Sequence, residues 1–187
     1  MLSELKEDYE DWNTHTPERF IFDLLVRRSQ TAIVDYWETI LEIIAANSDN
    51  EKDVELHMDM LALLEHLLNQ KVLHQTLEFY SEIVLKMILF PTLCWKSGSP
   101  STKIRKAGLI CFMKLIDQNL IPAAKMYANF KECCTKIKGC MDDDWCNDLR
   151  FAATIAMRHL LKYVSTECNK EDFIDFYADI LKRLDDA

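Results

Sequence analysis

The stretch DDDWCNDLRFAATIAMRHLL, residues 142–161, is the most informative about the fold, because it places a polar turn directly before a helical run. Within it, three acidic residues are followed by the aliphatic Leu149, the charged Arg150 and the pair Ala152-Ala153. The same order of residue types recurs around Ile104 and, more weakly, around Val54, so the three aliphatic residues lie 45 and 50 positions apart. Intervals of this size are typical of repeats made of a helix pair, and they favour a helical solenoid over a bundle.

The remainder of the chain is also predicted to be helical. Apolar residues recur at helical spacing, as in Leu61, Leu64 and Leu68, and only 3 Gly and 4 Pro are present, too few for a β-sandwich or barrel. Capping residues are expected at Thr16, Ser48, Ser99 and Asn169. The predicted helices cover residues 2–11, 17–29, 31–46, 51–69, 72–95 with a kink near Pro91, 101–118, 122–141, 147–165 and 170–184.

The turn at 142–153 resembles the Leu-Asp-Asp-x-x-x-x-Val-Arg-x-Ala-Ala junction of the HEAT-repeat family. The matching residues are Met141, Asp143, Leu149, Arg150, Ala152 and Ala153; Ile104, Arg105 and Ala107 match a second copy, and Glu55 replaces the expected Arg in a third. The resemblance implies a right-handed α-α superhelix of HEAT or armadillo-like type. It implies a single array over residues 1–187, with repeats at about 31–69, 72–118 and 122–165, an N-terminal helical segment and a truncated C-terminal half repeat.

The same resemblance gives the junction residues structural roles. Asp143 is expected to pair with Arg150 or with Arg105 of the preceding repeat, and Ile104 and Leu149 are the aliphatic junction positions. The acidic residues before position 149 would cap the following helix and interact favourably with its positive end.

A narrower resemblance comes from three segments taken in chain order. They are NTHTPERFIFDLLVRRSQ at 13–30, LCWKSG at 93–98 before IRKA at 104–107, and ILKRLDD at 180–186, and they resemble the C-terminal region of HEAT-repeat factors that assemble axonemal dynein. The resemblance implies a non-catalytic, cytoplasmic scaffold for preassembly of the dynein arms needed for ciliary motility. Its partners would be dynein heavy or intermediate chains and co-chaperones. The alternative is a generic HEAT scaffold or adaptor for transport or phosphatase-type complexes, and an enzyme is the less favoured class.

Composition favours a protein partner in a reducing compartment. The chain carries 22 Lys and Arg against 31 Asp and Glu, a net charge of −9, which disfavours nucleic acid and anionic membranes as partners. The longest apolar stretch, 83–95, contains Lys86 and is too short to span a bilayer. Seven cysteines, an odd number without a preceding secretory signal, are expected to be free thiols in the cytosol.

Metal binding and catalysis are disfavoured by residue spacing. Cys133, Cys134, Cys140 and Cys146 lack the paired spacing of a zinc site and are expected to fill helix interfaces. The acidic cluster of Asp142, Asp143, Asp144 and Asp148 lacks the Gly and the bidentate Glu of an EF-hand loop. No two histidines have the i, i+4 spacing of a helical metal site, and glycine is too scarce for a phosphate-binding loop. We therefore expect no catalytic residue, metal or cofactor.

Two surface features are candidates for partner binding. Lys103, Lys106 and Lys125, with other basic residues between 105 and 138, would form one patch if the helices at 101–118 and 122–141 are neighbours. Trp95 and Trp145 flank inter-helix turns, where aromatic residues can anchor interfaces, although core packing between repeats is the more frequent role.

Overall fold

The computed structural model describes residues 9–48, 53–94, 96, 98–168, 171 and 174 of the chain, and no strand occurs among them. The prediction of an all-α fold is confirmed. Nine α-helices are described: α1 (Pro17–Arg28), α2 (Trp37–Asn47), α3 (Val54–Leu68), α4 (His74–Ile83), α5 (Phe90–Thr92), α6 (Ser99–Asp117), α7 (Ala123–Ala128), α8 (Phe130–Met141) and α9 (Asn147–Tyr163). Three 3-10 segments, η1 (Tyr9–Asp11), η2 (Gln30–Tyr36) and η3 (Lys71–Leu73), and one π-helical segment, η4 (Val84–Leu89), lie between them.

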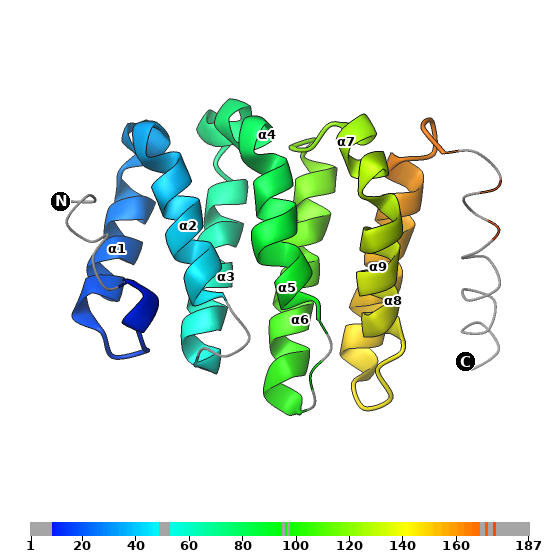
Figure 1. Cartoon of the computed structure of the whole chain (residues 1–187), viewed down its shortest axis with the longest axis horizontal. Coiled ribbons are helices and arrows are strands. Elements are labelled where there is room, and N and C mark those ends of the chain that lie inside the picture. Colours follow the sequence, from blue (N-terminus) through cyan, green and yellow to red (C-terminus); the bar gives the residue numbers. More distant parts are fainter. Residues whose placement is uncertain are drawn as a thin grey trace.

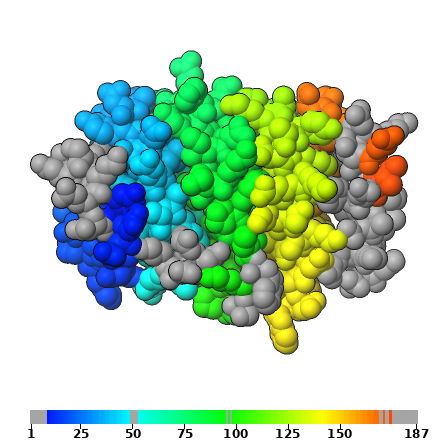
Figure 2. All heavy atoms as spheres, viewed as in Figure 1, coloured from blue at the N-terminus to red at the C-terminus, as the bar shows by residue number. Residues whose placement is uncertain are grey.

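The helices stand side by side in a row with two layers (Figure 1). One layer contains α1, α3, α6 and α9, in which α3 contacts α1 and α6, and α6 contacts α9. The other layer contains α2, the segment from α4 to α5, and α8, and each of these packs on the helix that follows it. In the space-filling view the sequence colours follow one another as bands from one end to the other (Figure 2). Segments that are close in sequence are therefore close in space along the whole row.

The apolar core runs between the two layers. In α6, Leu109, Phe112 and Leu115 are fully buried, because α6 is packed against both α3 and α9. In α3, Leu61 and Leu64 are likewise buried, as their helical spacing predicts. Burying a side chain of this size stabilises the folded state by about 1.5–3 kcal/mol, so the core helices carry most of the stability.

Several helix boundaries predicted from the sequence are wrong. The expected helix at 72–95 is divided into η3, α4, η4 and α5, and its departure from α geometry precedes Pro91. Pro91 cannot donate a backbone hydrogen bond, and in the turn before it Phe90 N–H donates to the Leu85 carbonyl five residues back. The helices expected at 31–46 and 122–141 are each interrupted, after Tyr36 and at Asn129. Of the helix expected at 2–11, residues 2–8 lie outside the described residues, and Tyr9–Asp11 form the 3-10 segment η1. The helix expected at 170–184 and the Asn169 cap also lie outside the described residues, apart from residues 171 and 174.

Two of the predicted caps are displaced. Ser48 is the C-cap of α2; Asp53 is the N-cap of α3, and its carboxylate accepts from the Glu55 N–H at 2.7 Å. Ser99 is the first residue of α6 and Gly98 is its N-cap, where a φ of 103° suits only glycine. The cap predicted at Thr16 is confirmed by position. In both displaced cases the sequence pattern marked the right turn and missed the residue that adopts the extended or left-handed conformation.

Two helical glycines give a stability prediction. A Cβ on Gly108 of α6 would lie 2.6 Å from Thr92 Cγ2, whereas a Cβ on Gly139 of α8 would meet nothing within 4 Å. We expect Gly108→Ala to lower the free energy of unfolding by about 1–3 kcal/mol through overpacking. We expect Gly139→Ala to raise it by about 0.5–1 kcal/mol, because alanine has the higher helix propensity. Urea denaturation of both variants checks this, and equal effects would contradict the close packing of α6 on α5.

Candidate functional site

The turn between α8 and α9 is organised by the carboxylate of Asp143. Its Oδ2 accepts a hydrogen bond from Arg105 Nη2 on α6 at 2.7 Å, and the exposed fractions of the two side chains are only 3% and 1%. Its Oδ1 accepts from the backbone N–H groups of Trp145 and Cys146 at 3.0 and 2.9 Å. One buried ion pair therefore holds the turn to α6, and the same carboxylate sets the backbone of Trp145.

Two further cations fix the same turn. Arg150 Nη1 donates to the backbone carbonyl of Asp143 at 2.8 Å, and its Nη2 donates to Asn147 Oδ1 at 2.5 Å. Lys106 of α6 lies 2.9 Å from Asp148 Oδ2 at the start of α9. The carboxylate of Asp143 is thus bound by Arg105, while Arg150 binds its carbonyl. The aliphatic residues Ile104 and Leu149 next to these arginines are both buried.

The hydrogen bonds that Asp143 accepts lower the pKa of its carboxyl group. Burial by itself raises the pKa, but the hydrogen bonds from Arg105 and from the N–H groups of Trp145 and Cys146 together outweigh burial and lower it below the usual 3.8. A carboxyl whose pKa is lowered in the folded state stabilises that state above its unfolded pKa. This contribution is lost as the pH falls through the folded pKa.

We therefore expect the stability difference between the parent and Asp143→Asn to be constant above about pH 5 and to shrink as the pH falls below about pH 4. Urea denaturation of both proteins between neutral and acidic pH measures that difference. Comparing the two proteins at each pH cancels the titration of the other carboxylates. A difference that does not change with pH would contradict the lowered pKa of Asp143.

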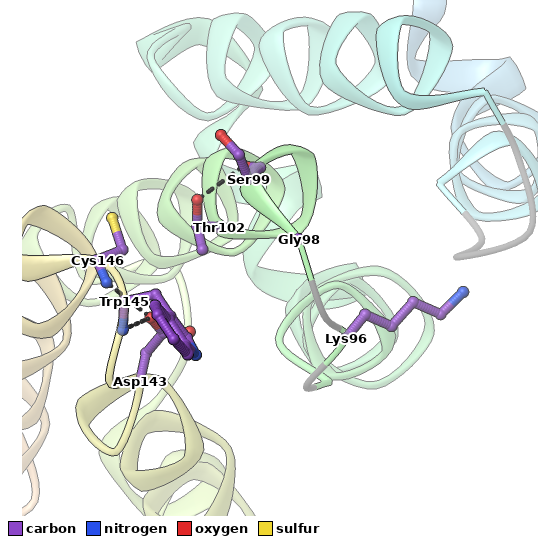
Figure 3. A pocket seen from close by; sticks show the side chains of 7 residues that line it. All are labelled: Lys96, Gly98, Ser99, Thr102, Asp143, Trp145 and Cys146. Atoms are coloured by element: carbon purple, nitrogen blue, oxygen red, sulfur yellow. Dashed lines mark hydrogen bonds between the residues drawn. The ribbon is translucent and has the colours of Figure 1, made fainter.

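Trp145 stands at the mouth of a cavity formed by this turn and the start of α6. The cavity has a volume of about 410 Å³ and is lined by Lys96, Gly98, Ser99, Thr102, Asp143, Trp145 and Cys146. Figure 3 shows the indole beside Asp143 and the Lys96 side chain extending away from it. Trp145 is 93% exposed, so the alternative role of core packing between repeats is wrong for this residue. A large aromatic side chain held in solvent by a rigid turn is suited to contact a partner.

The structure separates the lysines that were expected to form one patch. Lys103 and Lys106 lie in the first half of α6, at the same end of the helices as Trp145, whereas Lys125 lies on α7, which follows the other end of α6. The α-helical rise from residue 103 to 117 is about 20 Å. Lys103 and Lys106 therefore lie at the same end of the helices as Trp145, and Lys125 does not. Trp95 lies outside the described residues.

The buried cysteines pack and are poorly suited to react. Cys133, Cys134 and Cys140 are buried, which confirms the prediction that these thiols fill helix interfaces, whereas Cys146 is only partly buried. Cys111 is buried as well. Burial raises the pKa of Cys111 and Cys134 to about 12 and of Cys140 to about 11, so the thiol form dominates at neutral pH. Among the residues that the structure describes, no group of three or more His, Cys, Asp or Glu could hold a metal ion.

Other exposed apolar side chains were not predicted as surface features. Phe151, one turn into α9, is 69% exposed, and Phe79 and Met87 on the α4–η4 segment are 75% and 59% exposed. Periodicity alone placed such residues within amphipathic helices. Their exposure could not be identified from the sequence without knowing which helix faces the neighbouring layers cover.

Within the described part of the chain, no helix is both long and apolar enough to cross a membrane.

Comparison with known proteins gives one group of relatives. The chain is 22% identical over 191 residues to dynein axonemal assembly factor 5 of Mus musculus, 23% identical over 194 residues to that of Homo sapiens, and 18% identical over 195 residues to that of Xenopus laevis. Each alignment covers 100% of this chain, which spans only 22–23% of the length of these curated relatives. No protein-family model matches the chain, and no solved structure gives a significant match. The chain is thus a distant relative of one segment of these assembly factors.

Proposed function

We propose that this chain is a segment of a HEAT-type solenoid with three repeats. Each repeat consists of a first helical segment and a second helix: η2–α2 and α3, η3–α5 and α6, and α7–α8 and α9. The side-by-side order of the pairs supports this proposal (Figure 1). Ion pairs also join consecutive second helices: Arg19 of α1 to Asp59 of α3, Lys114 of α6 to Glu65 of α3, and Arg105 of α6 to Asp143 before α9. A stack in which each unit contacts its neighbours produces an extended surface for binding proteins.

The function proposed for this array is that of a non-catalytic, cytoplasmic protein-binding scaffold in the preassembly of axonemal dynein arms. The observation that carries it is the alignment of the whole chain with dynein axonemal assembly factor 5 from three organisms. The proposed partners are dynein heavy or intermediate chains and co-chaperones. In this role the chain contributes surface area and no reacting group.

The contact surface proposed for the client is the end of the helices that carries Trp145, Lys103 and Lys106. Trp145 supplies an aromatic anchor on a turn fixed by the buried Arg105–Asp143 pair, so little backbone conformational entropy is lost when a partner buries the indole. Lys103 is exposed, and Lys106 remains partly exposed beside Asp148. Positive charge around an aromatic anchor favours a client with an acidic rim.

A capture experiment tests the proposal. The purified chain is immobilised and exposed to cytosol of cells that are building motile cilia, and bound proteins are identified by mass spectrometry. We expect axonemal dynein chains to bind the parent and to be lost from Lys103→Glu/Lys106→Glu. The control Lys125→Glu/Lys131→Glu makes the same charge change on α7 and α8 and should retain them. Absence of dynein chains from the parent, with the protein shown to be folded by circular dichroism, would contradict the dynein role.

A further inference from the structure

A second cavity lies where α6 and α9 end, at the opposite end of these helices from Trp145. Its volume is about 490 Å³, and it is lined by Ile116, Asp117, Asn119, Arg158, His159, Lys162 and Tyr163. This volume falls within the range of about 300–1,000 Å³ that is typical of ligand pockets. The rise along α9 from residue 147 to 162 is about 20 Å, so the two cavities are separate sites.

Two cationic side chains that line this cavity form no ion pair with the described residues. Arg158 and Lys162 are four residues apart on α9, which places them on the same helix face, and both are exposed. Neither side chain makes a hydrogen bond or ion pair with any residue that the structure describes. By contrast, Arg105 and Arg150, at the other end of the same helices, both donate hydrogen bonds to the α8–α9 turn.

The other polar groups of the wall are held in place by one another. His159 Nδ1 lies 2.6 Å from Asp117 Oδ1, across the interface between α9 and α6, and Asp117 is the one carboxylate among the described residues that line the cavity. The Tyr163 hydroxyl donates to the Ile121 carbonyl at 2.5 Å. These bonds fix the walls and engage Asp117 with His159, so Arg158 and Lys162 are the cationic lining residues that stay available to a ligand.

We propose that this cavity binds a carboxylate-bearing segment of a protein partner, with Arg158 and Lys162 each contacting an acidic side chain of the segment. Arg presents a planar donor pair that matches a carboxylate, and Lys four residues away supplies a second positive charge. Hydrogen bonds to charged groups contribute more than those between neutral groups. With a net charge of −9 on the whole chain, a short acidic peptide meets less long-range repulsion than a polyanion such as nucleic acid. This proposal does not depend on the identity of the client at Trp145.

Fluorescence anisotropy of a labelled hexaglutamate peptide titrated with the full chain tests the site. We expect saturable binding that weakens with added salt, and a Kd at least about tenfold higher for Arg158→Gln/Lys162→Gln. The matched control Lys71→Gln/Lys131→Gln removes the same charge from exposed positions on η3 and α8 and should leave the Kd unchanged. A hexaglutamine peptide should not bind.

Three results would overturn the proposal. The first is no binding of hexaglutamate by the parent at concentrations up to about 1 mM, the upper end of weak specific affinities. The second is an equal loss of affinity in both double variants, which would show attraction by overall charge alone. The third is displacement of the peptide by inorganic phosphate at an equal concentration, which would make the cavity a general anion site. Thermal unfolding of each variant confirms that it is folded before titration.

Discussion

Asp143→Asn is expected to lower the free energy of unfolding by about 3–5 kcal/mol, because it leaves the Arg105 guanidinium as a buried charge without its counterion. Both side chains are almost completely buried and lie 2.7 Å apart. The substitution keeps the size of the side chain and its ability to accept from the N–H groups of Trp145 and Cys146. The loss therefore comes from the charge and not from a cavity. Urea denaturation monitored by circular dichroism measures it.

The control for this substitution is Asp144→Asn. Asp144 is adjacent in the chain and exposed, and its replacement changes the net charge by the same amount. A change within about 0.5 kcal/mol is expected there. The double variant Arg105→Met/Asp143→Asn should recover part of the lost stability, since it removes the buried Arg105 charge that Asp143→Asn leaves without a counterion. If Asp143→Asn and Asp144→Asn have equal effects, the pair does not organise the turn.

The turn at 142–153 shows how far sequence reasoning reaches. The order of residue types predicted a polar turn, a buried aliphatic residue and a helix, and Leu149 and α9 take these places. For the partner of Asp143 the sequence left two candidates, Arg105 and Arg150. The structure shows both bound to Asp143, one at the carboxylate and one at the backbone carbonyl. The choice of atom depends on the offset between α6 and α9, which no local pattern encodes.

Other features could not be predicted, because they depend on which faces the neighbouring helices cover. Trp145 and Phe112 are both large aromatic residues within apolar or turn-flanking patterns, yet one is 93% exposed and the other fully buried. Lys103 is on α6 and Lys125 is on α7, the next helix in the sequence, but most of the length of α6 separates the two residues. Local spacing gives the helix and its face, whereas the position of that face along the row is set by packing against α3 and α9.

The rigid turn and the exposed indole are related features of one site. An exposed tryptophan offers a partner a large apolar surface to bury, and tryptophan is enriched among the residues that dominate binding energy at interfaces. The bonds to Asp143 set the backbone at Trp145 and Cys146, so the point from which the indole projects is fixed before a partner arrives. Stability and binding should therefore separate: Asp143 supports both, while Trp145 supports binding alone.

Trp145→Ala is accordingly expected to weaken binding of the captured dynein chain by about 30-fold or more, the loss typical of an aromatic hot spot. The same change should leave the free energy of unfolding within about 0.5 kcal/mol of the parent, because the side chain has almost no contacts to lose. The matched control is Phe79→Ala, which removes a 75% exposed aromatic from α4 in the other layer. Biolayer interferometry with the purified dynein chain gives both affinities. Equal affinities for Trp145→Ala and Phe79→Ala would place the client contact elsewhere on the array.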